Sequence, residues 1–323
     1  MNTSMSRRRF LAASAAAAAA GPGMLSTAAV QGAEWKTKLK KALIGLPTEK
    51  TLTAWKEAGF DGMEAQHSDV SPERGENIRQ MAERIGVRIH STLYGWANFN
   101  QSEAFKREVE SVAKGLESAG NLGATAMLLV PCRIGGMAMP QPWEFDIDFD
   151  PSTGHLTRVA QGDNTPYRQY IDAHNEATDA THKAVEKLIP AAEKAGVVIA
   201  LENVWNNLWV KPAVFKHLVA SFDSPWVQAY FDIGNHVRYA PPEEWIQTLG
   251  TLIVRCHVKD FLLNPDGRGG KFVDIREGSV NWPTVRQELD RLGLDEMWMT
   301  IEGSGGLSLE ERSKRLDRII AGT

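Results

Sequence analysis

Four polar side chains in the second half of the sequence could together hold a metal ion. They are Glu202, Asp232, His257 and Glu302, and each ends a short apolar run such as residues 197–201. Such runs, rich in β-branched residues, are typical of buried parallel strands. Three carboxylates brought to one place with an imidazole would repel each other without a cation. An oxygen-rich set with one nitrogen suits Mn²⁺, our first expectation, or Mg²⁺ or Co²⁺, better than a thiolate-type zinc site.

Alternation along the four strands supports a common direction for these side chains. Residues two positions apart on a strand share a face, and the residue between them faces the other way. The pairs expected to point inward are Ala200 with Glu202, Tyr230 with Asp232, Arg255 with His257, and Thr300 with Glu302. The residues expected to face outward, toward helices, are Leu201, Phe231, Cys256 and Ile301. Taken singly, each candidate ligand could instead be a paired carboxylate or a hydrogen-bonded core histidine.

The elements that must position these residues alternate regularly. Strands are predicted at residues 42–46, 62–66, 87–93, 124–130, 197–203, 227–232, 252–258 and 297–302. Helices are predicted at residues 50–58, 73–85, 103–119, 168–195 with an interruption or kink at Pro190, 213–219, from 243, 284–292 and 309–320. A Gly-rich loop is expected after the seventh strand.

Eight strand–helix units within residues 34–323 predict one α/β domain, a (β/α)8 TIM barrel. Active sites of such barrels lie at the C-terminal ends of the strands, where the four candidate ligands stand. The competing doubly wound sheet needs a glycine fingerprint after its first strand, and the segment "IGLPTEK" has none.

Residues 132–166 break this alternation with prolines, glycines and acids, and predict a long loop over the barrel mouth that could serve as a lid. Aspartates at every second position from Asp146 to Asp150 mimic the start of a calcium-binding EF-hand loop. Pro151 stands where that loop needs glycine and Thr157 where it needs glutamate, so calcium is rejected there.

Composition narrows the class of protein. The chain has 323 residues, 43% of them hydrophobic, and a formal net charge of -4, which suits a soluble domain with a sizeable core. It lacks the basic excess that binding to a phosphate backbone needs, so nucleic acid is not expected as a partner. The two cysteines, Cys132 and Cys256, exclude a disulfide framework.

The first 33 residues differ in composition from the rest. Residues 6–11, "SRRRFL", resemble a twin-arginine export signal, and the alanine-rich stretch 12–20 is too short to span a bilayer. Cleavage is expected near residues 26–29 or 32–33, and the alternative is an unprocessed N-terminus. With no cysteine here for a lipid anchor, we expect a periplasmic or secreted protein without a stable membrane anchor, and the twin-arginine export machinery as a partner.

Several segments together resemble the sugar phosphate isomerase/epimerase family, whose members have a xylose-isomerase-like TIM barrel and include ketose 3-epimerases, hydroxypyruvate isomerases and inosose dehydratases. The segments are "ALENVW", "YFDIGNH", "CHVKD", "REGSVNW" and "TIEGSGG". The resemblance implies metal ligands at the four candidate positions and an acid/base pair at Glu202 and Glu302. The family often has a substrate-contacting histidine three residues after Asp232, where this chain has Asn235 followed by His236.

The chemistry that this site implies is proton removal next to a carbonyl group. A metal that binds the carbonyl oxygen and the neighbouring hydroxyl stabilises the enediolate that forms. The two glutamates can remove the proton and return it, so the first hypothesis is an isomerase or epimerase of a non-phosphorylated keto sugar or derivative. If a leaving group lies β to the carbonyl, the same site becomes a lyase or hydratase, for example of a keto-glycoside or inosose.

Two further hypotheses use the same barrel. One is a non-catalytic sugar-binding protein, against which all four filled ligand positions speak. The other is an AP-endonuclease-like barrel, which needs more histidines and a face that binds DNA. The sequence does not decide whether the protein forms a homo-oligomer.

The residues expected near a carbohydrate substrate are His90, Trp205, Asn206, Asn235, His236 and Lys259. Glu64, on the second strand, is a further candidate. Each of these side chains could instead pack or hydrogen-bond within the barrel. Residues 303–306, "GSGG", could cradle a phosphate, but a tight turn is preferred because sugar phosphates are mainly intracellular.

Overall fold

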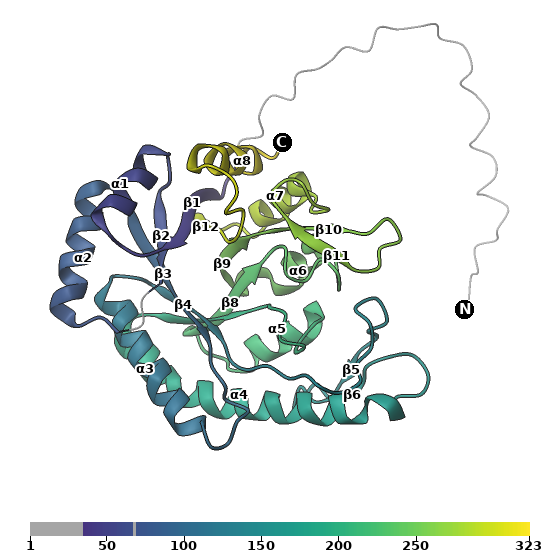
Figure 1. The fold of residues 1–323 in the computed structure, drawn as a ribbon. Coiled ribbons are helices and arrows are strands. Elements are labelled where there is room, and N and C mark those ends of the chain that lie inside the picture. Colours follow the sequence, from purple (N-terminus) through teal and green to yellow (C-terminus); the bar gives the residue numbers. More distant parts are fainter. Residues whose placement is uncertain (1–34, 67–68) are drawn as a thin grey trace, which may run out of the picture. The chain divides into compact units, whose positions relative to one another are not determined.

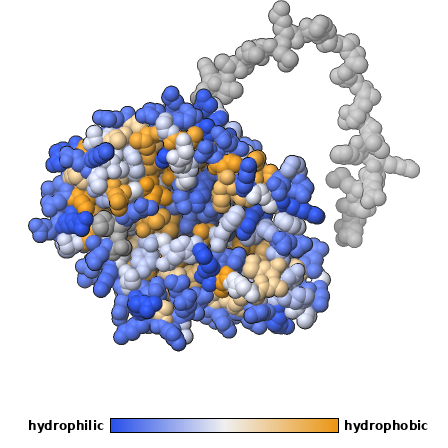
Figure 2. Space-filling model, viewed as in Figure 1, coloured by the Kyte–Doolittle hydropathy of each residue, from blue (hydrophilic) through white to orange (hydrophobic). Residues whose placement is uncertain are grey.

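The structure is a computed structural model, and it describes residues 35–66 and 69–323. The predicted export signal, its cleavage point and its arginine pair lie outside the described residues. Among the described residues, no helix is long and apolar enough to cross a membrane. The face of the described part seen in Figure 2 is largely hydrophilic, with hydrophobic residues between the charged ones.

Eight parallel strands close into a barrel in the order β1-β12-β9-β8-β7-β4-β3-β2 (Figure 1). Their bounds are β1 Lys38–Gly45, β2 Gly62–Ala65, β3 Arg88–Trp96, β4 Ala126–Val130, β7 Val198–Glu202, β8 Val227–Asp232, β9 Ile253–Val258 and β12 Glu296–Ile301. The predicted (β/α)8 barrel is thereby confirmed. The first strand starts earlier than predicted because its lysine-rich first half pairs with β12, a neighbour that local polarity does not reveal.

Eight α-helices in the described residues lie around the barrel (Figure 1). Their bounds are α1 Glu49–Glu57, α2 Pro72–Ile85, α3 Phe105–Asn121, α4 Arg168–Ala195, α5 Pro212–Ala220, α6 Pro242–Leu249, α7 Trp282–Arg291 and α8 Leu309–Ala321. Two short 3₁₀ helices, η1 Thr165–Tyr167 and η2 Gly250–Leu252, precede α4 and β9. The expected interruption at Pro190 is wrong, because α4 continues through it and is anchored on both sides by the buried Leu188 and Ala192.

Two hydrophobic cores result from the alternation of the strands. The core inside the barrel contains Ala126, Leu128, Val130, Ala200 and Tyr230. The larger core lies between barrel and helices and includes Leu201, Phe231, Cys256 and Ile301. These are the residues that the alternation assigned to the helix-facing side, so the direction of the four strands is confirmed.

Two antiparallel hairpins depart from the simple barrel. The first, β5 Asp148–Phe149 with β6 Leu156–Arg158, lies within the insertion 132–166. Buried Phe145, Leu156 and Val159 anchor this insertion, so it is a packed structure and not an open loop. The second hairpin, β10 Asp260–Leu263 with β11 Gly270–Val273, replaces the expected Gly-rich loop after β9. The prediction of a loop was wrong because the glycines lie at the hairpin turn and at the start of β11.

Candidate metal centre

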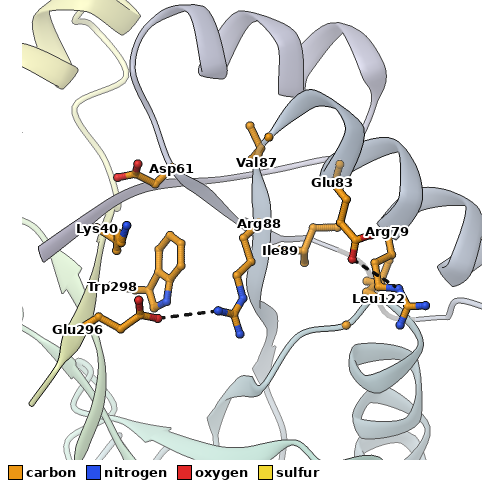
Figure 3. Close-up of a pocket in the computed structure, with 13 residues that line it drawn as sticks. Lys40, Asp61, Arg79, Glu83, Val87, Arg88, Ile89, Leu122, Glu296 and Trp298 are labelled. Atoms are coloured by element: carbon orange, nitrogen blue, oxygen red, sulfur yellow. Dashed lines mark ion pairs between the residues drawn. The ribbon is translucent and has the colours of Figure 1, made fainter. Parts of the chain in front are cut away.

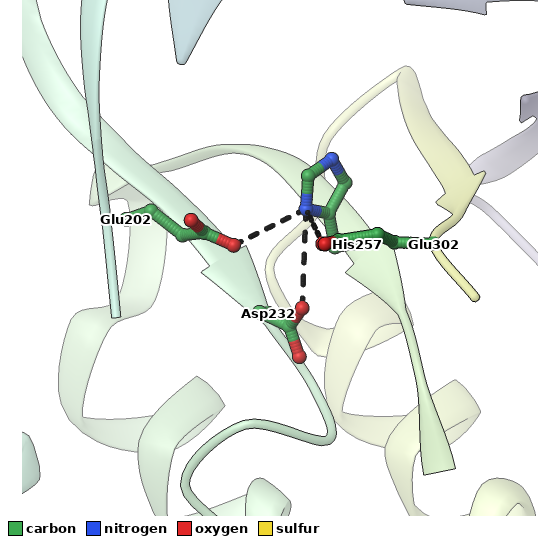
Figure 4. Close-up of side chains that lie close together, drawn as sticks. All are labelled: Glu202, Asp232, His257 and Glu302. Atoms are coloured by element: carbon green, nitrogen blue, oxygen red, sulfur yellow. Dashed lines mark hydrogen bonds and ion pairs between the residues drawn. The ribbon is translucent and has the colours of Figure 1, made fainter. Parts of the chain in front are cut away.

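Four strand ends bring the predicted ligands together. Glu202 and Asp232 are the last residues of β7 and β8, His257 is the second-last of β9, and Glu302 directly follows β12. The strands are in register here, since Asp232 pairs with His257 across β8 and β9. One ligand atom from each of the four residues lies within 4.8 Å of the others (Figure 4). The parallel barrel therefore gathers at one point side chains that are far apart in the sequence.

The Nδ1 atom of His257 is at the centre of this group, as the dashed lines in Figure 4 show. It lies 2.8 Å from Glu302 Oε2, 3.2 Å from Glu202 Oε1 and 3.9 Å from Asp232 Oδ2. Glu202, Asp232 and His257 are buried, whereas the side chain of Glu302 is 33% exposed. A molecule from solvent would therefore reach the group on the side of Glu302.

The donor atoms of this group fit a divalent cation. Asp232 Oδ2 and Glu302 Oε2 are buried and accept no hydrogen bond of good geometry from residues 35–66 or 69–323. The other oxygen of Asp232 accepts from the backbone N–H groups of Gly234 and Asn235 at 2.9 and 2.8 Å, which holds Oδ2 toward His257. Such unused carboxylate oxygens beside an imidazole nitrogen suit a hard or borderline divalent metal.

Glu64 lies behind the imidazole and sets its tautomer. Its Oε1 is 2.9 Å from His257 Nε2, and its Oε2 accepts a hydrogen bond of 2.7 Å from the hydroxyl of Ser91. An ionised carboxylate only accepts hydrogen bonds, so Nε2 carries the proton and Nδ1 faces the other three carboxylates. From the sequence alone, Glu64 was only a candidate substrate contact. The structure instead places it where it can orient a metal ligand.

Lys259 and Asn235, both predicted to contact substrate, lie beside the candidate ligands. Lys259 Nζ is 2.9 Å from Glu302 Oε2, 3.3 Å from Asp232 Oδ2 and 3.2 Å from Asn235 Oδ1. Asn235 Nδ2 lies 3.4 Å from Glu202 Oε1. These two residues therefore add a positive charge and an amide to the rim of the site.

The two candidate acid/base residues differ in their affinity for a proton. Burial raises the pKa of Glu202 above its ordinary value. Burial also acts to raise the pKa of Glu302, but the close contact with His257 and the charge of Lys259 outweigh it and hold that pKa below its ordinary value. Two carboxyl groups whose environments separate their pKa values in this way are suited to opposite proton-transfer roles.

Trp205 lies at the rim of the site, beyond the end of β7. Its Nε1 donates to the backbone carbonyl of Asn235, and the guanidinium of Arg238 lies 3.7 Å from its ring centre. Its other neighbours are the aromatic rings of the β10–β11 hairpin.

Three residues that were predicted to contact substrate are packed elsewhere. His90 is the third residue of β3 and not near its end; its ring stacks on Trp298 at 4.5 Å, below the metal group. His236 is buried and its Nε2 donates to the carbonyl of Val204, because the turn after β8 directs it outward against α6. Asn206 is also buried, and its amide ties the start of the insertion to the loop after β7 through the carbonyl of Cys132. These contacts agree with the alternative of packing within the barrel, and contact of the three residues with a substrate stays a prediction.

A cavity of about 530 Å³ adjoins the metal group on its exposed side. Glu302 and Lys259 line it together with residues of β11, of the following loop and of the turn after β12. In that turn, Ser304 Oγ accepts a hydrogen bond of 3.1 Å from the backbone of Ile275, so the hydroxyl holds the loop.

A second cavity, of about 680 Å³, lies at the opposite end of the barrel (Figure 3). Arg88 and Glu296, the first residues of β3 and β12, line it and form an ion pair of 3.8 Å. Arg79 and Glu83 of α2 lie 3.9 Å apart on another wall. This end of a barrel usually serves stability, and it is remote from the strand ends that carry the candidate ligands.

Comparison with known proteins adds a family and a fold. The sequence profile of the family described as "Xylose isomerase-like TIM barrel" matches residues 52–318. A search of curated proteins found no match. Many solved structures share the fold. The three described next have low sequence identity to this chain.

Three of these structures illustrate the different proteins that share the fold. A xylose isomerase-like TIM barrel protein from Mycobacterium smegmatis in complex with magnesium is 17% identical, with a TM-score of 0.60 over 90% of this chain and 96% of that one. The 3-keto-D-glucoside 4-epimerase of E. coli is 14% identical, with a TM-score of 0.62 over 87% and 99%. Mannonate dehydratase from Streptococcus suis is 12% identical, with a TM-score of 0.62 over 88% and 94%. At these identities the likeness shows the fold alone.

Proposed function

Because this chain belongs to the xylose isomerase-like TIM barrel family, we propose that it is a divalent-metal-dependent isomerase or epimerase of a non-phosphorylated keto sugar or a derivative. One observation carries the proposal: Glu202, Asp232, His257 and Glu302 converge at the C-terminal ends of consecutive barrel strands, with one ligand atom of each within 4.8 Å of the others. Barrel enzymes place their chemistry at this end.

The proposed ligands are these four residues, and Mn²⁺ remains the expected metal with Mg²⁺ or Co²⁺ as alternatives. Support for a divalent cation comes from the oxygen-rich donor set and from the magnesium bound to the similar barrel of Mycobacterium smegmatis. When bound, such a metal polarises a carbonyl group and so eases removal of the proton beside it.

Glu202 and Glu302 are the proposed acid/base pair. One of them removes the proton beside the carbonyl group, and the other returns a proton to the substrate. The different surroundings of the two carboxyl groups support different roles, since burial raises the pKa of Glu202 and the nearby His257 and Lys259 lower that of Glu302 against the effect of burial. Lys259 and Asn235 at the rim can hydrogen-bond the oxygens of the substrate. A proton removed on one face and returned on the other inverts the carbon.

A lyase or hydratase that uses the same residues is the second candidate. If the substrate carries a leaving group β to the carbonyl, the same proton removal leads to elimination. The similarity to a dehydratase, beside the similarity to an epimerase, favours keeping this candidate. Keto-glycosides and inososes are substrates of the required chemistry.

The test joins metal analysis to proton exchange in D₂O. Purified protein loaded with Mn²⁺ is incubated with unphosphorylated keto sugars, keto-glycosides and inososes, and deuterium incorporation is followed by NMR. We expect exchange at one carbon that is lost on chelation and falls at least about 100-fold in Glu302→Gln, since general acid–base catalysis contributes about that much. Loss of a leaving group would assign the lyase. Exchange in none of the substrates, with Glu302→Gln equal to the wild type, would overturn both candidates.

The place of action is a further part of the proposal. We propose that the twin-arginine signal in residues 1–33 directs the protein to the periplasm or the exterior. The substrate is then a small carbohydrate met outside the cytoplasm, which agrees with an unphosphorylated sugar.

A further inference from the structure

Beyond the candidate ligands, an extension of the cavity beside the metal group is lined by Phe272, Asp274 and Glu277. The cavity as a whole is also lined by Glu302 and Lys259. Its volume is about 530 Å³, within the range of pockets that enclose ligands larger than a single small ring. The site therefore has room for a part of the substrate that does not react.

An exposed aromatic ring forms one wall of this extension. Phe272, on β11, is 43% exposed, although most large hydrophobic side chains of the barrel are buried. The Nζ atom of Lys259 lies 5.6 Å from the centre of its ring, so the ring directly adjoins the candidate centre. An aromatic face can pack against the C–H face of a sugar ring or against another aromatic ring.

The Phe272 ring is held in place from behind. Phe261 lies opposite it on β10, with ring centres 5.2 Å apart, and Trp205 lies on another side at 4.8 Å. Phe261 is itself buried. A rigid aromatic surface that is already in position loses little freedom when a ligand stacks on it, which favours binding.

The remaining wall of the extension is polar. Asp274 and Glu277 lie there, and Glu277 is held by an ion pair of 2.7 Å with Arg315. Carboxylate oxygens accept hydrogen bonds from hydroxyl groups. An aromatic face and such acceptors in one cavity suit a hydroxyl-bearing ring.

From this arrangement we infer that the substrate is a glycoside, whose second ring stacks on Phe272 while its keto-sugar ring lies at the metal group. The inference rests on the proposed function and narrows its substrate class. The second ring is a sugar or an aromatic aglycone, and both would use the same contact.

The test measures binding of probes with one or two rings to Mn²⁺-loaded protein by calorimetry and saturation-transfer NMR. The probes are D-glucose, cellobiose and phenyl β-D-glucopyranoside. We expect the two-ring probes to bind roughly three- to tenfold more tightly than glucose, because the free energy of one stacking contact corresponds to a change in Kd of that size. Comparison of cellobiose with the phenyl glucoside shows whether a sugar or an aromatic group is preferred as the second ring.

Phe272→Ala should remove that difference, whereas Phe272→Tyr should keep it. Leu262→Ala is the matched control, because Leu262 is a similarly exposed side chain (38%) on the same hairpin that does not line the cavity. Equal binding of one-ring and two-ring probes, or equal effects of Phe272→Ala and Leu262→Ala, would overturn the inference. Deuterium exchange in a one-ring keto sugar tests the proposed function separately, so either can fail alone.

Discussion

At the scale of single residues, the imidazole of His257 lies between one carboxylate on one side and three on the other. Glu64 accepts a hydrogen bond from Nε2–H on one side of the ring, and the three other carboxylates face Nδ1 on the other side. Glu64 is fully buried and also accepts from Ser91, so its position is determined by the barrel interior. A carboxylate in this position raises the basicity of a ligating histidine and fixes its orientation.

Glu64→Gln should therefore weaken metal binding without abolishing the fold. The amide oxygen can still accept from Nε2, but the negative charge that supports the imidazole is lost. We expect the Kd for Mn²⁺ to rise about 10- to 100-fold, as measured by calorimetric titration. Glu76→Gln, on the surface of α2, serves as the control. An unchanged Kd in Glu64→Gln would show that the contact does not act on the metal site.

At the scale of elements, one buried carboxylate organises a wall of the cavity beside the candidate metal centre. Asp260, the first residue of β10, accepts hydrogen bonds from the backbone N–H groups of Phe261, Arg276 and Val280 and from Trp282 Nε1, at 2.8 to 3.3 Å. These donors come from the hairpin, the following loop and the start of α7. The segments "CHVKD" and "REGSVNW" are thus joined through this one side chain.

Asp260→Ala should loosen all of these segments together, because several buried donors lose their acceptor. The expected loss in free energy of unfolding is about 3 kcal/mol, since hydrogen bonds to a charged group are worth about 1.5–3 kcal/mol each and part of the loss is relieved by water. Urea denaturation followed by tryptophan fluorescence measures it.

Asp266→Ala, in the turn of the same hairpin, is the matched control because its carboxylate is exposed and accepts one hydrogen bond, from the backbone of Arg268. Equal stability of the two variants would contradict the organising role of Asp260.

At the scale of the whole molecule, we propose separate tasks for the barrel and for the first 33 residues. The barrel needs no disulfide in its described part, where both cysteines are free and buried. We propose that this domain folds, and takes up the proposed metal, in the cytoplasm before export in the folded state, as the resemblance of residues 6–11 to a twin-arginine signal implies.

Replacement of Arg7 and Arg8 together by lysine should stop export and leave the barrel intact. We expect the protein to remain in the cytoplasmic fraction of a bacterial host, with unchanged thermal stability after purification. Cell fractionation and immunoblotting measure this. Arg9→Lys, next to the arginine pair, should be exported normally. Equal export of the double variant and of Arg9→Lys would exclude the twin-arginine route.

The eight strands and the candidate ligands could be predicted from the sequence alone, because both depend on local patterns. Apolar runs of strand length mark each buried strand, and alternation decides that Glu202 and Asp232 face inward. In a closed parallel barrel, residues at the ends of consecutive strands must meet, so convergence follows once the fold is known.

Only the tertiary structure decided what surrounds those ligands. Glu64 and His257 are 193 positions apart, and no local pattern indicates that β2 brings one behind the other. The turn after β8 turns His236 away from the site and keeps Asn235 in it, although the two are neighbours in sequence. The hairpin that carries Phe272 forms because two short segments pair across a turn. Such contacts depend on side chains and turns that meet only after folding.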